Sequence, residues 1–193
     1  MTTTKTGKLF IISGPSQVGK DTIVKILQRD RRLNLAHIIT NTTRPKRAGE
    51  RNHVYINFLS EIAFNNLIKT NQLLEWANVN GYHYGTPKQP VLKELTKGRS
   101  VILNIEVRGA AQIKAKLPRT ILIFIKAESS AEIKRRIFAS PKMTTAIKQK
   151  RWRTAQAELK ASKNYDYIVV NRWGQLKATV TEVKKIIKRH LNK

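Results

Sequence analysis

A buried strand followed by a glycine-rich turn and a helix is the feature that most constrains this chain. Leu9 to Ser13 is an apolar run of strand length, and the next residues read Gly14-Pro-Ser-Gln-Val-Gly19-Lys20-Asp21-Thr22. After this turn, Ile23, Val24 and Leu27 recur at helical spacing. The backbone N–H groups of such a turn can approach phosphate oxygens closely, and the positive end of the helix dipole faces the same anion. Strand, turn and helix in this order predict a site for a nucleoside triphosphate.

The turn also predicts how the phosphates are held. Lys20 is placed to bridge the β- and γ-phosphates, and Asp21 stands where the pattern usually has Ser or Thr. A carboxylate at that point can bind Mg²⁺ directly or through water, and Thr22 still supplies a hydroxyl near the helix start or caps the helix. We therefore predict Mg²⁺ as the cofactor, with Asp21 and Thr22 as its candidate ligands. The predicted triphosphate-binding residues are Gly14, Pro15, Ser16, Gln17, Val18, Gly19, Lys20, Asp21 and Thr22.

The rest of the chain alternates apolar runs of strand length with segments of helical period, which is typical of an α/β protein. Helical segments follow each buried strand, so we expect a parallel sheet covered on both faces. Between the first helix and Ser100 the strands are short and half polar, which predicts an antiparallel insert. Further core strands are predicted at Ser100–Ile105, Arg119–Ile125 and Tyr167–Val170. The insert is predicted to contain strands Ile38–Thr43, Val54–Phe58 and Leu73–Asn80 and helix Glu61–Thr70.

Two features are predicted near the C-terminus. Ser140 to Thr145 breaks the helical pattern with a Pro and small polar residues before the pattern resumes from Thr145 to Ser162, which indicates a flap between helices. The last helix, Gln175–Leu191, should pack one apolar stripe on the core. The stripe consists of Leu176, Val180, Val183, Ile187 and Leu191.

Composition limits the class of protein and its partners. The 193 residues include no Cys, and no run approaches the roughly 18 apolar residues of a membrane span. Because Met1 to Lys8 is polar and lacks an apolar signal segment, we expect a cytoplasmic protein with no membrane partner. The 38 Lys and Arg against 12 Asp and Glu give a net charge of +26. This excess favours either a solvated basic surface or electrostatic association with nucleic acid, while the oligomeric state is not specified.

Four further segments carry recognisable motifs. They are Thr42-Thr-Arg-Pro-Lys-Arg-Ala-Gly-Glu50, Leu74-Glu-Trp-Ala77 with Gly81-Tyr-His-Tyr-Gly-Thr86, Leu103-Asn-Ile-Glu-Val-Arg-Gly-Ala110, and Arg151-Trp-Arg-Thr-Ala-Gln-Ala-Glu-Leu159. Together with the glycine-rich turn and Tyr167 to Asn171, these segments cover nearly the whole chain. In this order they resemble guanylate kinase, a nucleoside-monophosphate kinase of the P-loop superfamily, with the departures of a divergent member. The resemblance implies a P-loop core at residues 1–37, 88–137 and 162–193, a GMP-binding insert at 38–87, and a lid with its following helix at 138–161.

The resemblance also implies an activity and a set of site residues. The chain is expected to transfer the terminal phosphoryl group of ATP to GMP, with Lys20, Arg44, Arg47 and Arg151 as catalytic residues. An arginine fork suits phosphate oxygens, and paired carboxylate oxygens suit the N–H groups of a guanine edge. The implied GMP-binding residues are the phosphate-contacting Arg44, Arg47, Tyr55 and Tyr84, the guanine-recognising Glu75, the hydroxyls of Thr40 and Thr86, and Glu106, which replaces an Asp of the family.

The chain departs from the family pattern at further places as well. Asn104 replaces the first acid of an Asp-x-Asp motif, and we hypothesise that Asp21 supplies the lost charge from the neighbouring loop. Phe138 and Ser140 stand where the family has two arginines before the flap. Cations nearby can partly substitute for them, namely Lys142, Lys148 and Arg153. Gln17 replaces a common Gly.

Three alternatives stay open on the sequence. The first is a guanylate-kinase-like binding module that has lost its chemistry, as Asn104, Phe138 and Ser140 suggest. The second is a related kinase with another acceptor, because Gly-Lys-Asp-Thr resembles the loop of ribose bisphosphate kinases. The third is a nucleic-acid-binding protein on the same scaffold, suggested by the charge alone.

Overall fold

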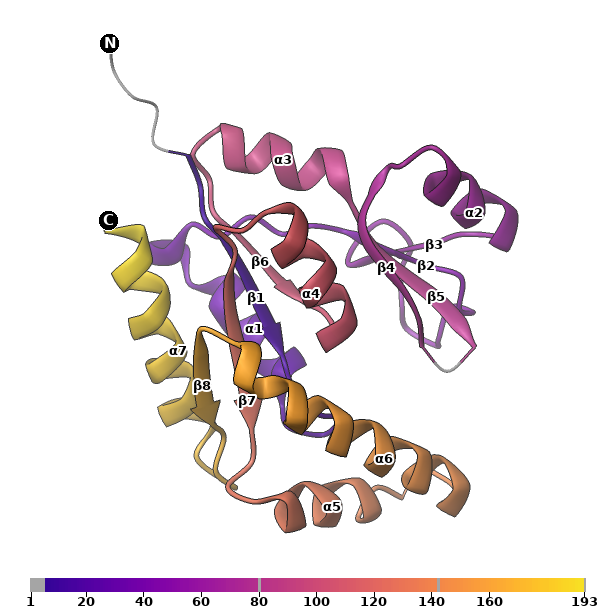
Figure 1. Cartoon of the computed structure of the whole chain (residues 1–193), viewed down its shortest axis with the longest axis vertical. Coiled ribbons are helices and arrows are strands. Elements are labelled where there is room, and N and C mark those ends of the chain that lie inside the picture. Colours follow the sequence, from indigo (N-terminus) through magenta and orange to yellow (C-terminus); the bar gives the residue numbers. More distant parts are fainter. Residues whose placement is uncertain (1–5, 80, 142, 193) are drawn as a thin grey trace.

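A computed structural model describes residues 6–79, 81–141 and 143–192. Strands and helices are interspersed along the chain, with two short 3₁₀ turns in the part that the structure describes (Figure 1). The strands are β1 (Leu9–Ser13), β2 (Thr40–Thr42), β3 (Ile56–Phe58), β4 (Leu73–Val79), β5 (Tyr82–Pro87), β6 (Val101–Asn104), β7 (Ile121–Lys126) and β8 (Tyr167–Val170). The helices are α1 (Lys20–Arg29), α2 (Glu61–Lys69), α3 (Lys88–Thr96), α4 (Val107–Lys116), α5 (Ser130–Phe138), α6 (Thr145–Ala161) and α7 (Leu176–Leu191).

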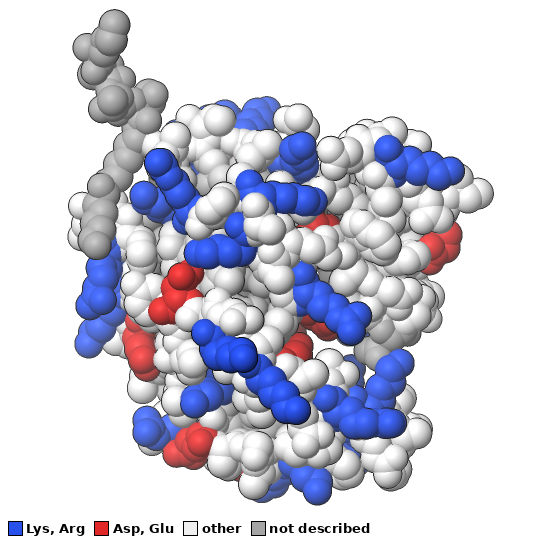
Figure 2. Space-filling model, in the orientation of Figure 1, with Lys and Arg blue, Asp and Glu red and all other residues white. Residues whose placement is uncertain are grey.

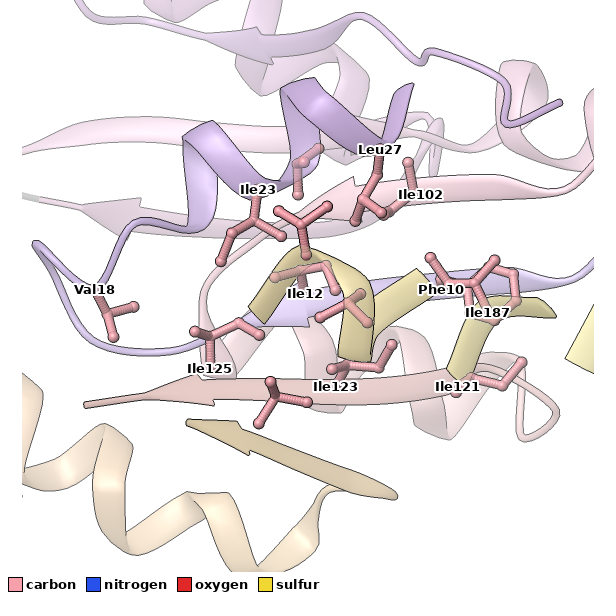
Figure 3. Packing of buried hydrophobic residues seen from close by; sticks show 14 of the residues in the cluster. Phe10, Ile12, Val18, Ile23, Leu27, Ile102, Ile121, Ile123, Ile125 and Ile187 are labelled. Atoms are coloured by element: carbon pink, nitrogen blue, oxygen red, sulfur yellow. The ribbon is translucent and has the colours of Figure 1, made fainter. Parts of the chain in front are cut away.

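The first sheet is parallel and has the strand order β6-β1-β7-β8, which confirms the predicted α/β fold with helices on both faces. Alternate β1 side chains point to opposite faces. Phe10 and Ile12 pack with residues of α1 and α7 in one cluster (Figure 3). Leu9 and Ile11 pack with residues of α3 and α4 in the other. Because both faces are covered, β1 is buried along its whole length and fixes where the following loop begins.

The helix predictions in the core are confirmed at their apolar faces. Ile23, Val24 and Leu27 are the buried residues of α1, as their spacing predicted. The stripe of α7 is buried at its centre and partly buried at its two ends. β7 starts at Ile121 rather than Arg119, because a turn closed by the Thr120 N–H and the Leu117 carbonyl oxygen at 3.0 Å precedes it.

The second sheet belongs to the insert and has the order β3-β2-β5-β4. The β2–β5 and β4–β5 pairs are antiparallel, as predicted for the insert, whereas β2 and β3 pair in parallel, which the prediction did not include. The long connection between β2 and β3 lets the chain return in the same direction. Sequence reasoning also missed β5, because Tyr82–Pro87 carries no apolar alternation. The predicted strand Leu73–Asn80 is β4, with Asn80 outside the described residues.

The predicted break before the long helix is confirmed. Helix α5 begins after the cap Ser129, and α6 begins after Thr144, whose hydroxyl oxygen accepts from the Ile147 N–H. The two helices lie against each other near the lower edge of Figure 1. Across the described ranges, no helix is both long and apolar enough to cross a membrane.

Candidate active site

The glycine-rich turn forms a tight loop over the end of β1. Gly14 and Gly19 have φ angles of 147° and 91°, and a Cβ at Gly14 would collide with the Ile125 carbonyl oxygen on β7. Lys20 is the first residue of α1, and its Nζ donates to the carbonyl oxygens of Gly14 and Pro15 at 2.5 and 2.8 Å. The ammonium group therefore lies over the loop, where a phosphate would replace these carbonyl partners.

Gln17 takes the left-handed backbone conformation with a φ of 65°. Glycine adopts that conformation without steric cost, whereas a residue with a Cβ does so at a cost of about 1 kcal/mol. The geometry thus explains why a glycine is the usual residue at this point. The side chain of Gln17 is exposed, so it does not obstruct the loop.

A buried asparagine after β8 ties the loop to the core. The Asn171 Nδ2 donates to the Val18 carbonyl oxygen at 2.8 Å, and its Oδ1 accepts from the Thr179 hydroxyl at 2.8 Å. The Asn171 carbonyl oxygen accepts from the buried Arg136 at 3.0 Å, while the Arg136 Nε pairs with Glu132. Sequence reasoning gave these residues no role, although Asn171 ended one of the matching segments. Their contacts show that the loop is held by α5 and α7 together.

Asp21 and Asn104 are in direct contact. The Asn104 Nδ2 donates to the Asp21 Oδ1 from the carboxyl end of β6. The neutral amide therefore occupies the place beside the loop where a second carboxylate would repel Asp21. Thr22 lies in the first turn of α1 with an exposed side chain.

Arg151 reaches the loop from helix α6. Its Nη1 donates to the Ser16 hydroxyl oxygen at 2.6 Å, and among the described residues its buried Nε has no hydrogen-bond partner. A buried guanidinium N–H without an acceptor is costly, and an anion bound at the loop would satisfy it. The structure thus brings Arg151 to the phosphate loop, as the matching segment implied. Lys148 and Arg153 lie on the same helix, and Lys142 is outside the described residues.

Glu75 and Thr86 face each other across the β4–β5 pair of the insert. The Thr86 hydroxyl donates to the Glu75 Oε1 at 2.6 Å, and both residues are buried. Gly109 on α4 lies so close that a Cβ there would collide with the Glu75 carboxylate. Burial raises the pKa of Glu75, against the stabilising bond from Thr86 and the charge of Lys116. The sequence thus positions a confined, weakly solvated carboxylate where the insert meets α4.

Arg44 and Arg47 lie next to each other around Glu50. Arg44 donates to Glu50 through Nη1 and Nη2 at 2.7 and 2.6 Å, and its guanidinium lies 5.2 Å from the Phe58 ring centroid. Glu50 also accepts from the Arg47 backbone N–H at 2.8 Å. The bond to Arg44 lowers the pKa of Glu50 to about 2. Glu50 therefore remains ionised and holds the guanidinium of Arg44 in place.

The remaining insert residues are not all brought together. Tyr84 on β5 interacts with Arg44, which is the arrangement that the resemblance implied. Tyr55 instead packs edge-on against His37, and its ring lies 6.0 Å from the Lys25 Nζ. Thr40 lies on β2, where its backbone N–H donates to the Tyr55 carbonyl oxygen at 3.4 Å.

Four of the twelve acids are connected by charge interactions between the loop and the insert. Asp21, Glu106 and Glu158 interact with Lys20, and Glu106 also interacts with Glu75. Glu106, the N-terminal cap residue of α4, interacts with the charges of both Lys20 and Glu75. Glu158 on α6 was missed, because one acid on a helix carries no signal of its own. Burial raises the pKa of Glu158 to about 7, against the attraction of Lys20. Burial lowers the pKa of the Lys20 ammonium, although Glu158, Asp21 and Glu106 oppose that shift.

A parallel sheet with a glycine-rich loop after its first strand, and a lysine at the start of the next helix, defines a nucleotide-binding protein of the P-loop class. The family model for guanylate kinase matches residues 6–190. The chain therefore belongs to the guanylate kinase family.

Individual relatives agree with this assignment. The guanylate kinase of Thermobifida fusca (strain YX) is 42% identical over 164 residues, which are 85% of this chain and 83% of that protein. The guanylate kinase of Clostridioides difficile (strain 630) is 37% identical over 190 residues, with 98% and 91% covered. The crystal structure of guanylate kinase from Anaplasma phagocytophilum aligns with a TM-score of 0.77 at 25% identity, covering 98% of this chain and 88% of that one.

Proposed function

We propose that this protein transfers the terminal phosphoryl group of ATP to GMP, giving ADP and GDP. The observation that carries the proposal is the series of charges that connects the phosphate loop with the buried carboxylate of the insert. Glu106 interacts with the charges of both Lys20 and Glu75, which supports a triphosphate site and an acceptor site on either side of Glu106. A phosphoryl group can pass directly between two nucleotides only if their phosphates meet in this way.

On the donor side, the chain supplies backbone N–H groups and two cationic side chains. Lys20 lies over the loop and would exchange its two carbonyl partners for phosphate oxygens. Arg151 would donate from its unsatisfied Nε to a phosphate oxygen while its Nη1 donates to the Ser16 hydroxyl oxygen. Both groups would stabilise negative charge on the transferring phosphoryl group.

On the acceptor side, we propose that the insert at residues 38–87 binds GMP. Glu75 offers two oxygens of one carboxylate, which match the adjacent N–H donors on the edge of guanine, whereas adenine lacks that donor pattern. The Thr86 hydroxyl fixes the orientation of the carboxylate. Glu106 and Thr40 are proposed to contact the nucleoside.

Arg44 and Arg47 are proposed to hold the acceptor phosphate. A guanidinium has five N–H donors, so Arg44 can bind phosphate oxygens while it keeps its bond to Glu50. Tyr84 adds a neutral O–H donor beside Arg44. The same role for Tyr55 requires its ring to leave its contact with His37.

The residues beside the loop fit a magnesium ion that arrives with ATP. The Asp21 carboxylate and the Thr22 hydroxyl are oxygen ligands of the kind Mg²⁺ prefers, and they adjoin the predicted phosphate site. Among the described residues there is no cluster of three or more His, Cys, Asp or Glu side chains that could hold a metal ion. This agrees with an ion held mainly by phosphates and water. When bound, the ion would neutralise charge on the phosphates.

The proposed chemistry needs no covalent intermediate with the protein. Lys20 and Arg151 position the donor, Arg44 and Arg47 position the acceptor, and residues 138–161 act as a lid that excludes water. Arg151 connects the lid to the loop through Ser16, so lid position and phosphate binding are coupled. The absence of arginines at Phe138 and Ser140 makes Arg151 the proposed lid cation.

An acceptor panel tests the function. ADP formation is measured with ATP, Mg²⁺ and each of GMP, AMP, CMP, UMP and ribose 1,5-bisphosphate. We expect turnover with GMP that exceeds every other acceptor by at least about tenfold, since a polar site rejects bases that leave its carboxylate unpaired. Equal turnover with ribose 1,5-bisphosphate, or tight ATP binding without any turnover, would overturn the proposal in favour of another acceptor or a binding module.

A second property is favoured by the net charge of +26. Lys and Arg side chains are spread over the face shown in Figure 2, where acidic residues are few. We propose that the protein works in the cytoplasm and associates with nucleic acid electrostatically. Such binding should fall steeply between 50 and 200 mM salt, by about 1,000-fold for six phosphate contacts. Binding to duplex DNA that is undetectable at 50 mM salt would remove this second property and leave the kinase proposal intact.

A further inference from the structure

Trp173 is an aromatic side chain to which neither the fold nor the proposed chemistry gives a role. It lies in the loop between β8 and α7, and 66% of its surface is exposed. The guanidinium carbons of Arg135 and Arg136 lie 4.7 and 5.3 Å from its ring centroid. Two arginines of α5 therefore contact the indole through cation–π interactions, while most of its surface faces solvent.

A short series of hydrogen bonds connects the segment that carries Trp173 with the phosphate loop. Trp173 follows Asn171 by two residues, and the Asn171 Nδ2 donates to the Val18 carbonyl oxygen in the loop. Arg136, one of the two arginines on the ring, donates to the Asn171 carbonyl oxygen. The same residues thus hold both the loop and the aromatic ring.

The strand order determines the side of the loop on which a donor base must lie. In the order β6-β1-β7-β8, the loop follows β1, and β6 and β8 lie on opposite sides of it. The proposed acceptor site is on the β6 side, because Glu75 lies against Gly109 of α4, directly after β6. With its terminal phosphate toward Glu75, as the proposed transfer requires, the rest of ATP would extend toward β8 and the loop that carries Trp173.

We propose that the exposed indole of Trp173, held by Arg135 and Arg136, is a stacking surface for the base of the donor nucleotide. Stacking on an aromatic face is available to every base and is strongest for a large purine. Trp173 is therefore a binding residue for the triphosphate and makes no contact with the acceptor. The inference rests on the proposed function in taking the phosphate loop as the donor site and the surroundings of Glu75 as the acceptor site.

The test compares ATP with inorganic tripolyphosphate, which has the phosphates but no base. Binding of each to Trp173→Ala and to the unmodified protein is measured by calorimetry in the presence of Mg²⁺. We expect Trp173→Ala to weaken ATP binding about tenfold or more, the usual loss for one stacked base, and to leave tripolyphosphate binding unchanged. Trp173→Phe should retain most of the ATP affinity, because it keeps an aromatic face.

Two further measurements separate stacking from damage to the loop. Arg172→Ala removes a neighbouring charge and should affect ATP and tripolyphosphate to the same extent. In a Trp76→Phe/Trp152→Phe background, ATP should quench the fluorescence of Trp173, whereas tripolyphosphate should not. Unchanged ATP affinity in Trp173→Ala, or equal losses for ATP and tripolyphosphate, would overturn the inference. Neither result would touch the kinase proposal, because GMP-dependent turnover of the unmodified protein is measured separately.

Discussion

Asn104 donates a hydrogen bond to the carboxylate of Asp21, joining the end of β6 to the first turn of α1. The contact is between a neutral amide and an acid, so one negative charge is present at this point beside the phosphate loop. The sequence hypothesis that Asp21 supplies the charge missing at Asn104 requires these residues to be neighbours, and they are. Whether the charge serves Mg²⁺ stays a prediction.

Moving the negative charge from residue 21 to residue 104 tests that prediction. Asp21→Ser should raise the Mg²⁺ concentration needed for half-maximal ATP binding by about tenfold, the usual cost of disturbing residues around a metal. Asp21→Ser combined with Asn104→Asp should recover most of the loss, because the charge returns from the other side. Titrations of Mg²⁺ followed by nucleotide binding measure both effects. If the double variant needs as much Mg²⁺ as Asp21→Ser, the position of the charge matters and its mere presence does not.

A substitution at Gly109 tests the close contact between α4 and the Glu75 carboxylate. A methyl group there would collide with the Glu75 carboxylate, so Gly109→Ala should weaken GMP binding and destabilise the fold by about 1–3 kcal/mol. In a Glu75→Ala background the same change should stabilise α4 by about 0.5–1 kcal/mol, since alanine is the better helix residue. Urea unfolding of the four proteins gives both free-energy differences. The same sign in both backgrounds would contradict the contact.

Arg151 should contribute to catalysis more than to substrate affinity. Arg151→Lys keeps a charge but loses the planar fork that reaches Ser16, and we expect kcat to fall about 100-fold with little change in KM for GMP. Arg153→Lys on the exposed side of the same helix is the matched control and should leave kcat within about twofold, as exposed charges contribute little. Steady-state kinetics at saturating ATP distinguishes the two. Equal effects of both changes would contradict a specific role for the Arg151 guanidinium.

Glu158 makes a prediction about pH. Because burial raises its pKa to about 7, the folded protein keeps a proton that the unfolded chain, with a pKa of 4.5, has already released. The folded state binds more protons between these values, so the free energy of unfolding falls as pH rises from 4.5 to 7. The loss attributable to Glu158 is at most about 3 kcal/mol and is complete above pH 7.

Glu158→Gln should remove this loss. The difference in the free energy of unfolding, Glu158→Gln minus the unmodified protein, should be more positive at pH 8 than at pH 5. Glu182→Gln, a change at an exposed position on α7, is the control and should show no such trend. Urea unfolding at the two pH values provides the comparison. A parallel pH dependence in Glu158→Gln and the unmodified protein would mean that the group titrates normally.

Much of the core could be predicted from the sequence because its signals are local. The β1 strand, its glycine-rich turn and the buried face of α1 depend on residues that adjoin one another, and all three agree with the structure. The insert was predicted less well. Its strands are short and half polar, so neither β5 nor the parallel pairing of β2 with β3 left a periodic signal.

Some residues of the candidate site could be predicted from local sequence signals, and others could not. Lys20 and Glu75 lie in segments with recognisable neighbours, and the structure places them along one series of charges. Glu158 and Trp173 depend on contacts across long sequence separations, which one sequence does not encode in any pattern. The pairing of Arg44 with Glu50 was missed for a different reason, since either residue alone has the character of a solvated charge.

Direct transfer of the phosphoryl group between two bound nucleotides is tested most directly by following the labelled γ-phosphate of ATP. ATP labelled at the γ-phosphate is mixed with GMP, Mg²⁺ and an excess of the protein, and products are separated after one turnover. The account predicts that the label appears in GDP, and that Lys20→Ala slows this transfer about 100-fold or more. Label released as inorganic phosphate, with none in GDP, would contradict it.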